Sequence, residues 1–348
     1  MTDHSLKILV LGAGAIGTYI GGSLAVNNNL VWFFDRHESV DRLRRSGIKI
    51  IQPDKKEDFI EKPNVSADLE EILKNTVFDC GIIAVKSYDT ESLVNQLNQI
   101  NMKLPPLICF QNGVENEDFI REKLENSIVF AGSVTTAIGK SGNNEIIVEK
   151  LRGIGIEKNG PLTEKLTNAM NNAGLHAQLY KNANDMKWSK LLTNLTSNAL
   201  SAILGMPPSE TMTNLSLYKL EIEQFRETLR VMNSYGFHIV NLPGTPVKPF
   251  AWIVKNLPPI ISQKILNNFI IKGRGKKMPS FFLDLENGRG KSEVYYLNGA
   301  VSRFGKKNNI KTPINDFYTD ILMGLTVGRI QRSDYQFKPD FLSSQIYQ

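Results

Sequence analysis

The stretch 8–22, "ILVLGAGAIGTYIGG", joins an apolar run to a helical run through the pattern Gly12-x-Gly14-x-x-Gly17. In a strand–turn–helix unit, the first glycine permits a tight turn and the second lets the backbone approach a pyrophosphate. The third packs the helix against the strand, and the helix N-terminus adds N–H donors for the phosphate. The stretch therefore predicts a dinucleotide-binding loop, formed by Gly12, Ala13, Gly14, Ala15, Ile16 and Gly17.

The order of apolar and helical runs extends this prediction to the whole chain. Apolar runs at 7–11, 30–34, 106–110 and 127–136 alternate with helical runs, which is typical of a parallel sheet covered on both faces. From about residue 185 onward, helical periods dominate. We predict an α/β protein with an N-terminal Rossmann-type doubly wound sheet in a domain 1–183, followed by an all-helical domain 184–348. Residues 145–157 are expected to form a late β-hairpin or meander, and 294–308 a helix.

Composition limits the class of protein. The 348 residues carry a net charge of +6 and are 41% hydrophobic, as in a soluble protein of two domains. The basic surplus suits an anionic small molecule, but no aromatic-interleaved basic stripe indicates nucleic acid. Neither a signal peptide nor an apolar run of the ~20 residues that span a membrane is evident, so a cytoplasmic protein is expected. The cysteines and histidines lack metal-ligand spacing, and no metal site is predicted.

The end of the second apolar run bears on the choice of cofactor. It reads "FFDRHES" (33–39), with Asp35 beside Arg36. A carboxylate at this position holds a ribose 2′-hydroxyl, as in NAD, whereas an arginine holds the 2′-phosphate of NADP. Both alternatives remain open on these residues alone.

A polar line runs along the stretch 186–203, "MKWSKLLTNLTSNALSAI", which we expect to be one helix. Lys190, Asn194 and Asn198 recur at every fourth position among leucines, so they share one line of that helix. A surface lysine is the ordinary interpretation of Lys190. Two buried asparagines, however, need hydrogen-bond partners, because each unsatisfied group costs about 1–3 kcal/mol. A ligand in contact with this line would satisfy them.

Five motifs, in this order, give the chain a resemblance that spans nearly its whole length: "GAGAIG", "AVKSYDT", "FQNGVEN", "WSKLLTNLTSNALSAI" and "KSEVYYLNG". The chain resembles the ketopantoate reductases (2-dehydropantoate 2-reductases). The resemblance implies reduction of 2-dehydropantoate to pantoate with NADPH, in the biosynthesis of pantothenate and coenzyme A. It also implies a small anionic keto acid as partner, and dimers are common in the family, so a homodimer is one expectation.

The resemblance also assigns roles to individual residues. It implies that Arg36 binds the 2′-phosphate and that Lys86 and Asn112 line the nicotinamide and the reacting centre. It implies that Lys190 is the catalytic lysine and that Glu293 is the glutamate facing substrate and cofactor. The substrate-binding residues that it implies are Asn112, Asn194, Asn198 and Ser280.

Two departures from the family pattern keep alternatives open. Asp35 stands where family members usually have a small residue, and Tyr295 replaces an aspartate near Glu293. These residues motivate a second hypothesis, an NAD-dependent D-2-hydroxyacid dehydrogenase of the same superfamily. A non-catalytic nucleotide-binding sensor is a hypothesis from a different class, and Lys190 and Glu293 argue against it, because a sensor needs no proton donor.

Overall fold

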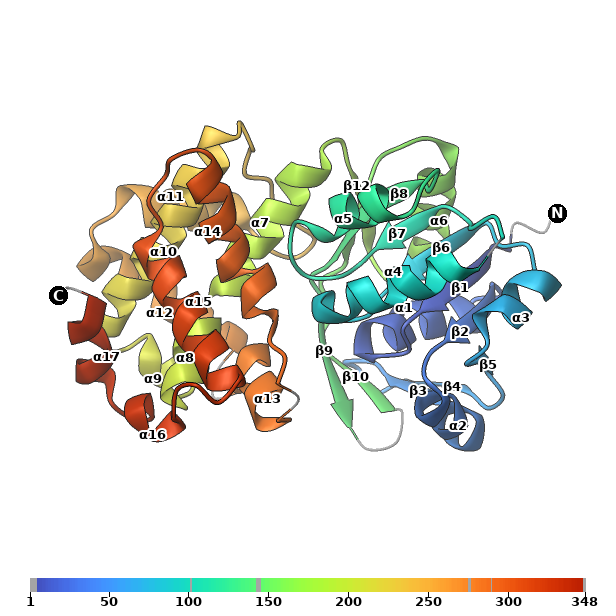
Figure 1. Cartoon of the computed structure of the whole chain (residues 1–348), viewed down its shortest axis with the longest axis horizontal. Helices are drawn as coiled ribbons and strands as arrows, with labels where there is room; N and C mark the ends of the chain where they lie inside the picture. Colours follow the sequence, from blue (N-terminus) through green and yellow to red (C-terminus); the bar gives the residue numbers. More distant parts are fainter. Residues whose placement is uncertain (1–4, 101, 142–144, 275–276, 289, 347–348) are drawn as a thin grey trace. The chain divides into compact units, whose positions relative to one another are not determined.

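The computed structural model describes residues 5–100, 102–141, 145–274, 277–288 and 290–346 (Figure 1). Its contacts divide the chain into two compact units. The first, the nucleotide-binding unit, comprises Met1–Gln111, Glu115–Lys187 and Leu242–Thr245. The second, the helical unit, comprises Asn112–Val114, Trp188–Asn241 and Pro246–Gln348. The predicted domain division after residue 183 stays a prediction.

The nucleotide-binding unit is built on a large sheet, with eight strands among the described residues in the order β12-β11-β8-β7-β6-β1-β2-β5. Strands β5, β2, β1, β6, β7 and β8 follow one another in the sheet, and each is parallel to its neighbours in this series. Strand β11 is antiparallel to β8. This arrangement confirms the Rossmann-type sheet. The strands are β1 (Lys7–Leu11), β2 (Leu30–Phe34), β5 (Asn64–Ser66), β6 (Cys80–Ile83), β7 (Leu107–Cys109), β8 (Val129–Val134), β11 (Ile154–Glu157) and β12 (Ala177–Tyr180).

Helices cover both faces of this sheet (Figure 1), and an apolar layer lies between the sheet and the helices on each face. One face packs against α3 (Leu69–Asn75), α4 (Thr90–Gln99) and α5 (Asn116–Lys123). The other face packs against α1 (Ala15–Val26), α2 (His37–Ser46) and α6 (Pro161–Asn172). Helix α1 also contacts a smaller sheet with the order β4-β3-β10-β9, which explains why Gly17 through Leu24 are all buried.

The small sheet corrects the expected hairpin at 145–157. Its strands are β3 (Ile48–Ile51), β4 (Glu57–Ile60), β9 (Ala137–Ser141) and β10 (Glu145–Lys150). Strand β10 pairs with β3 and β9, whereas β11 pairs with β8 and β12 of the large sheet. The hairpin prediction is wrong because the chain changes sheets at Gly153, where φ is +140° and a side chain would overlap the backbone oxygen of His176.

The helical unit confirms the predicted helical C-terminal region. Its long helix α10 (Leu215–Ser234) packs against helices that include α11 (Val247–Asn256), α12 (Pro259–Arg274), α14 (Asn298–Lys307), α15 (Pro313–Thr326) and α17 (Pro339–Ile346). The expected helix at 294–308 is preceded by a 3-10 turn, η2 (Glu293–Tyr296), and begins only at Asn298. The remaining helices are α7 (Ala183–Leu195), α8 (Asn198–Leu204), α9 (Pro208–Thr211), α13 (Ser280–Glu286) and α16 (Arg332–Tyr335). Over the described part of the chain, none of the helices combines the length and apolarity needed to cross a membrane.

The expected single helix over 186–203 is broken in the structure. Ser197 adopts a left-handed conformation, with φ 50° and ψ 14°, between α7 and α8. Two side chains of α10 replace the hydrogen bonds that the break removes. The Glu221 carboxylate accepts a bond from the Ser197 N–H at 2.9 Å, and the Gln224 amide donates to the Leu195 oxygen at 3.4 Å. The prediction of one continuous helix is therefore wrong.

Another buried carboxylate on α10 holds the start of α15. Glu227 accepts hydrogen bonds from the N–H groups of Ile314 at 2.8 Å and Asn315 at 3.0 Å, and from the Asn315 side chain at 2.7 Å. Burial raises the pKa of Glu227 to about 7, although these three bonds act in the opposite direction. The N-terminal donors of α15 are thus satisfied from within the core.

We expect Glu227→Gln to lower the free energy of unfolding by about 1–3 kcal/mol, because the NH₂ group of the introduced glutamine would face the N–H donors that the carboxylate now accepts from. The loss should also depend on pH. Glu227 in the folded chain keeps its proton up to a pKa of about 7, whereas the unfolded chain releases it near the ordinary value of 4.5. As the pH rises from about 4.5 to about 7, the free energy of unfolding of the parent therefore falls. The difference in this free energy between parent and variant should shrink over the same range. Urea unfolding across this range checks the prediction, with Glu210→Gln, at an exposed glutamate of the same unit, as control. A difference that stays constant with pH would contradict it.

Candidate active site

The glycine loop has the geometry of a pyrophosphate cradle. Gly12 has φ +103°, and a Cβ there would lie 2.7 Å from Val85 Cγ1 and 2.9 Å from Val85 N. A Cβ on Gly17 would overlap the oxygen of Gly12. At Gly14, in contrast, a Cβ would have no described heavy atom within 4 Å, so the space before the N-terminus of α1 is open. The loop therefore fits a dinucleotide phosphate.

The two residues predicted to discriminate between cofactors, Asp35 and Arg36, lie beside this loop. Strands β6, β1 and β2 are neighbours, so the segments after them share the carboxyl edge of the sheet. The Asp35 carboxylate accepts a hydrogen bond from the Ala13 N–H at 2.7 Å and another from its neighbour, the Arg36 N–H, at 2.7 Å. Arg36 Nη2 lies 3.5 Å from Oδ2 of Asp89, which follows Lys86 in the segment after β6. The structure thus places the Asp35 carboxylate at the backbone of Arg36 and the Asp89 carboxylate at its guanidinium.

The structure also shows a buried ion pair that the sequence did not reveal. Lys187 Nζ lies 2.8 Å from Glu117 Oε1, and the two side chains are 5% and 7% exposed. The same nitrogen donates to the backbone oxygens of Gln111 at 2.8 Å and Gly132 at 3.4 Å. A lysine in a helical run looks like a surface residue, so no pattern in the sequence distinguished Lys187.

The ion pair belongs to a chain of buried polar groups beneath two site loops. The Gln111 amide donates to the Thr90 hydroxyl at 2.7 Å, and that hydroxyl donates to Asn116 at 3.1 Å. The Asn116 amide then donates to the Ser87 hydroxyl at 3.4 Å. Ser87 directly follows Lys86, and Gln111 directly precedes Asn112. The network therefore fixes the backbone next to two predicted site residues.

Within the helical unit, the polar line of α7 and α8 meets two further predicted residues. Asn194 Nδ2 donates to Asn112 Oδ1 at 3.0 Å. Asn198 Nδ2 donates to the Ser280 hydroxyl at 3.3 Å, and its oxygen accepts from the Phe281 N–H at 3.1 Å. The structure therefore brings together Asn112 with Asn194, and Ser280 with Asn198, despite the break at Ser197.

Lys190 and Glu293 lie on elements of the same unit. Lys190 is half-buried on α7, one turn before Asn194. On the opposite face of α7, the Trp188 ring packs against the rings of Phe237 and Phe304. Glu293 is 2% exposed and begins η2, which packs against α13, the helix that carries Ser280. The Tyr295 side chain is 45% exposed, and the Arg303 guanidinium lies 4.0 Å from its ring centroid.

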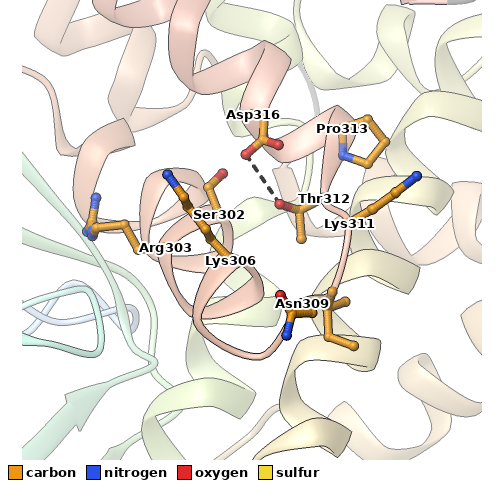
Figure 2. Close-up of a pocket in the computed structure, with 9 residues that line it drawn as sticks. Ser302, Arg303, Lys306, Asn309, Lys311, Thr312, Pro313 and Asp316 are labelled. Atoms are coloured by element: carbon orange, nitrogen blue, oxygen red, sulfur yellow. Dashed lines mark hydrogen bonds between the residues drawn. The ribbon is translucent and has the colours of Figure 1, made fainter.

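A hollow of about 700 Å³ lies elsewhere in the helical unit, between the end of α14 and the start of α15 (Figure 2). Its lining consists of Ser302, Arg303, Lys306, Asn309, Ile310, Lys311, Thr312, Pro313 and Asp316. The Thr312 hydroxyl donates to Asp316 at 3.2 Å, drawn as the dashed line in Figure 2. None of the predicted site residues is among these lining residues, so we do not assign the hollow to the predicted site.

A Rossmann-type unit with an intact glycine loop, followed by a helical unit, defines the class of the protein as a dinucleotide-binding α/β protein with a helical C-terminal region. Two family models match consecutive parts of the chain. The model "Ketopantoate reductase PanE/ApbA" matches residues 8–160, and its "C terminal" counterpart matches residues 182–326. The chain belongs to the ketopantoate reductase family.

Curated relatives agree with this membership, and solved structures share the fold. A 2-dehydropantoate 2-reductase of Pyrococcus abyssi is 26% identical over 92% of this chain and 97% of its own. The Lactococcus lactis enzyme of the same name is 24% identical over 91% of this chain and 97% of its own. A ketopantoate reductase of Ralstonia eutropha has a TM-score of 0.78 at 23% identity, covering 93% of this chain and 99% of its own. D-mandelate dehydrogenase with NADH and anilino(oxo)acetate has a TM-score of 0.75 at 23% identity over the same shares, and these structures support the fold.

Proposed function

We propose that the protein reduces 2-dehydropantoate to pantoate, with NADPH as the preferred cofactor, in pantothenate and coenzyme A biosynthesis. The observation that carries the proposal is the set of polar contacts in the helical unit. Asn112 with Asn194, and Asn198 with Ser280, form pairs around the line that begins at Lys190. These amides and hydroxyls can both donate and accept, as recognition of a keto acid with a distal hydroxyl requires.

The reaction can be divided among residues of this chain. Reduced nicotinamide would supply the hydride for the keto carbon. Lys190 donates the proton to the oxygen on which negative charge develops, as a general acid. Asn112, Asn194 and Asn198 orient the carbonyl and the distal hydroxyl, and Glu293 accepts a hydrogen bond from that hydroxyl. Ser280 holds Asn198 in place, because their side chains are already hydrogen-bonded.

Initial rates with a panel of 2-keto acids, each with NADPH and NADH, test this function. The panel should contain 2-dehydropantoate, its analogue without the hydroxyl, and the bulky aromatic phenylglyoxylate. We expect the highest kcat/KM with 2-dehydropantoate and NADPH. No reduction of any acid would leave only the hypothesis of a nucleotide-binding sensor.

Glu293→Gln should separate recognition of the hydroxyl from the chemistry. We expect KM for 2-dehydropantoate to rise about tenfold, since a charge-assisted hydrogen bond is exchanged for a weaker one. KM for the analogue without the hydroxyl should stay nearly unchanged. Steady-state kinetics with both substrates make the comparison, and an equal loss for both would assign Glu293 to the cofactor or to the fold.

Cofactor preference should depend on Asp35 and Arg36 in opposite senses. Arg36 can pair with a 2′-phosphate through charge-assisted hydrogen bonds, whereas the Asp35 carboxylate repels it and favours a free ribose hydroxyl. We expect Arg36→Ala to shift the ratio of kcat/KM values toward NADH, and Asp35→Ala to shift it toward NADPH. If Arg36→Ala left the ratio unchanged while Asp35→Ala abolished NADH use, the enzyme would be NAD-dependent.

A second candidate function is an NAD-dependent D-2-hydroxyacid dehydrogenase. Asp35 favours it, because its carboxylate is held at the glycine loop by the Ala13 N–H at 2.7 Å, where a ribose hydroxyl could bind. A higher kcat/KM with phenylglyoxylate and NADH than with 2-dehydropantoate and NADPH would establish this candidate over the first.

A further inference from the structure

We propose that Asp89 is a specificity-determining residue, which competes with the cofactor 2′-phosphate for Arg36 and so weakens the preference for NADPH. This inference rests on the proposed use of a nicotinamide dinucleotide. It goes beyond the choice between Asp35 and Arg36, because Asp89 belongs to a different strand-end segment and the resemblance assigns it no role.

The position of Asp89 is set by the backbone. Asp89 ends the 3-10 turn η1 (Ser87–Asp89), and its N–H donates to the Lys86 oxygen at 2.8 Å. The turn follows β6, the neighbour of β1 in the sheet, and therefore stands beside the glycine loop. Asp89 Oδ2 lies 3.5 Å from Arg36 Nη2, which comes from the segment after β2 on the other side of β1. The pair thus joins the segments on the two sides of the cofactor loop.

The two partners differ in how firmly they are held. The Arg36 side chain is 78% exposed, whereas that of Asp89 is only 20% exposed. Arg36 can therefore move to another anion, while Asp89 stays with its turn. An exposed ion pair of this kind is weak and exchangeable. The cofactor 2′-phosphate can replace Asp89 as the partner of the Arg36 guanidinium. The Asp89 carboxylate then stays nearby and repels the phosphate.

The local charge supports competition. The Asp35 carboxylate accepts a hydrogen bond from the Arg36 backbone N–H, and Asp89 pairs with the Arg36 guanidinium, so Arg36 has two carboxylates as neighbours and the three side chains sum to one negative charge. A dianionic 2′-phosphate meets one guanidinium and two carboxylates, whereas a neutral 2′-hydroxyl meets little repulsion. Removing the charge of Asp89 releases Arg36 and removes one repulsive group, and both changes favour the phosphate.

The test measures nucleotide binding without turnover. Isothermal titration of the full chain with adenosine 2′,5′-bisphosphate and with 5′-AMP compares the parent with Asp89→Asn. We expect the affinity for the bisphosphate to rise about three- to tenfold, the effect of one unit charge near the protein surface. The affinity for 5′-AMP should change less than about twofold, since it carries no 2′-phosphate.

Two controls separate competition from general charge. Glu91→Gln removes the same charge from an exposed residue in the first turn of α4, and should leave both affinities nearly unchanged. In an Arg36→Ala background, the gain from Asp89→Asn should fall by at least about half, because no arginine is released. An equal gain with and without Arg36, or from Glu91→Gln, overturns the inference.

The remaining outcomes distinguish this inference from the proposed function. If both nucleotides bind and Asp89→Asn changes neither affinity, the inference is overturned and the proposed function stands. If neither the parent nor Asp89→Asn binds either nucleotide, the proposed function is contradicted, and the inference with it.

Discussion

Lys190→Ala is expected to lower kcat by about 10²- to 10⁴-fold, the usual contribution of a positioned general acid. The side chain is half-buried on α7, one turn before the Asn194–Asn112 hydrogen bond, so it stands at the head of the proposed substrate contacts. The substitution removes the proton donor and leaves the glycine loop untouched. Single-turnover rates with 2-dehydropantoate measure the loss, and titration with NADPH should show nearly parental binding.

Stability and a matched lysine serve as controls for this result. Lys219 is an exposed lysine of α10 in the same unit, and Lys219→Ala should retain parental turnover. Thermal unfolding of both variants should be close to that of the parent, because neither lysine is deeply buried. Turnover of Lys190→Ala within about tenfold of the parent, at equal stability, would exclude Lys190 as the proton donor.

Lys187→Ala, only three positions earlier, is expected to have a different effect: a loss of about 3–5 kcal/mol in the free energy of unfolding. The substitution leaves the Glu117 carboxylate buried without the cation that lies 2.8 Å from it. It also removes the donor from the oxygens of Gln111 and Gly132. Urea unfolding measures the loss, and a destabilised loop at Gln111 should also raise KM through its neighbour Asn112.

The double variant Lys187→Met/Glu117→Gln tests the physical reason. Most of the cost in Lys187→Ala arises from an unpaired buried charge, so removing both charges should recover at least about 1 kcal/mol. A double variant as unstable as Lys187→Ala would instead assign the loss to packing. The paired results for Lys187 and Lys190 would then show which lysine of α7 serves the fold and which serves the reaction.

Local patterns in the sequence were sufficient for the fold class and for the cofactor loop. Gly12 and Gly17 are required by backbone geometry, and Gly14 keeps the space before α1 open, all within one strand–turn–helix unit, so a short stretch contains the whole signal. The structure confirms the doubly wound sheet and the helical C-terminal region that these patterns predict. Expectations about residues 145–157 were wrong because the pairing of β10 and β11 depends on distant strands rather than on their own sequence.

The tertiary structure alone decided how the polar residues are paired. The helix break at Ser197 depends on Glu221 of α10, and the ion pair of Lys187 depends on Glu117 of α5. Likewise, the contact of Arg36 with Asp89 joins segments that follow β2 and β6. Each partner comes from an element remote in the sequence, and periodicity within a single element carries no information about it. Sequence by itself determined which backbone each segment forms and where the nucleotide loop lies, whereas packing between elements decided which charges are buried, which are paired, and which remain to meet a ligand.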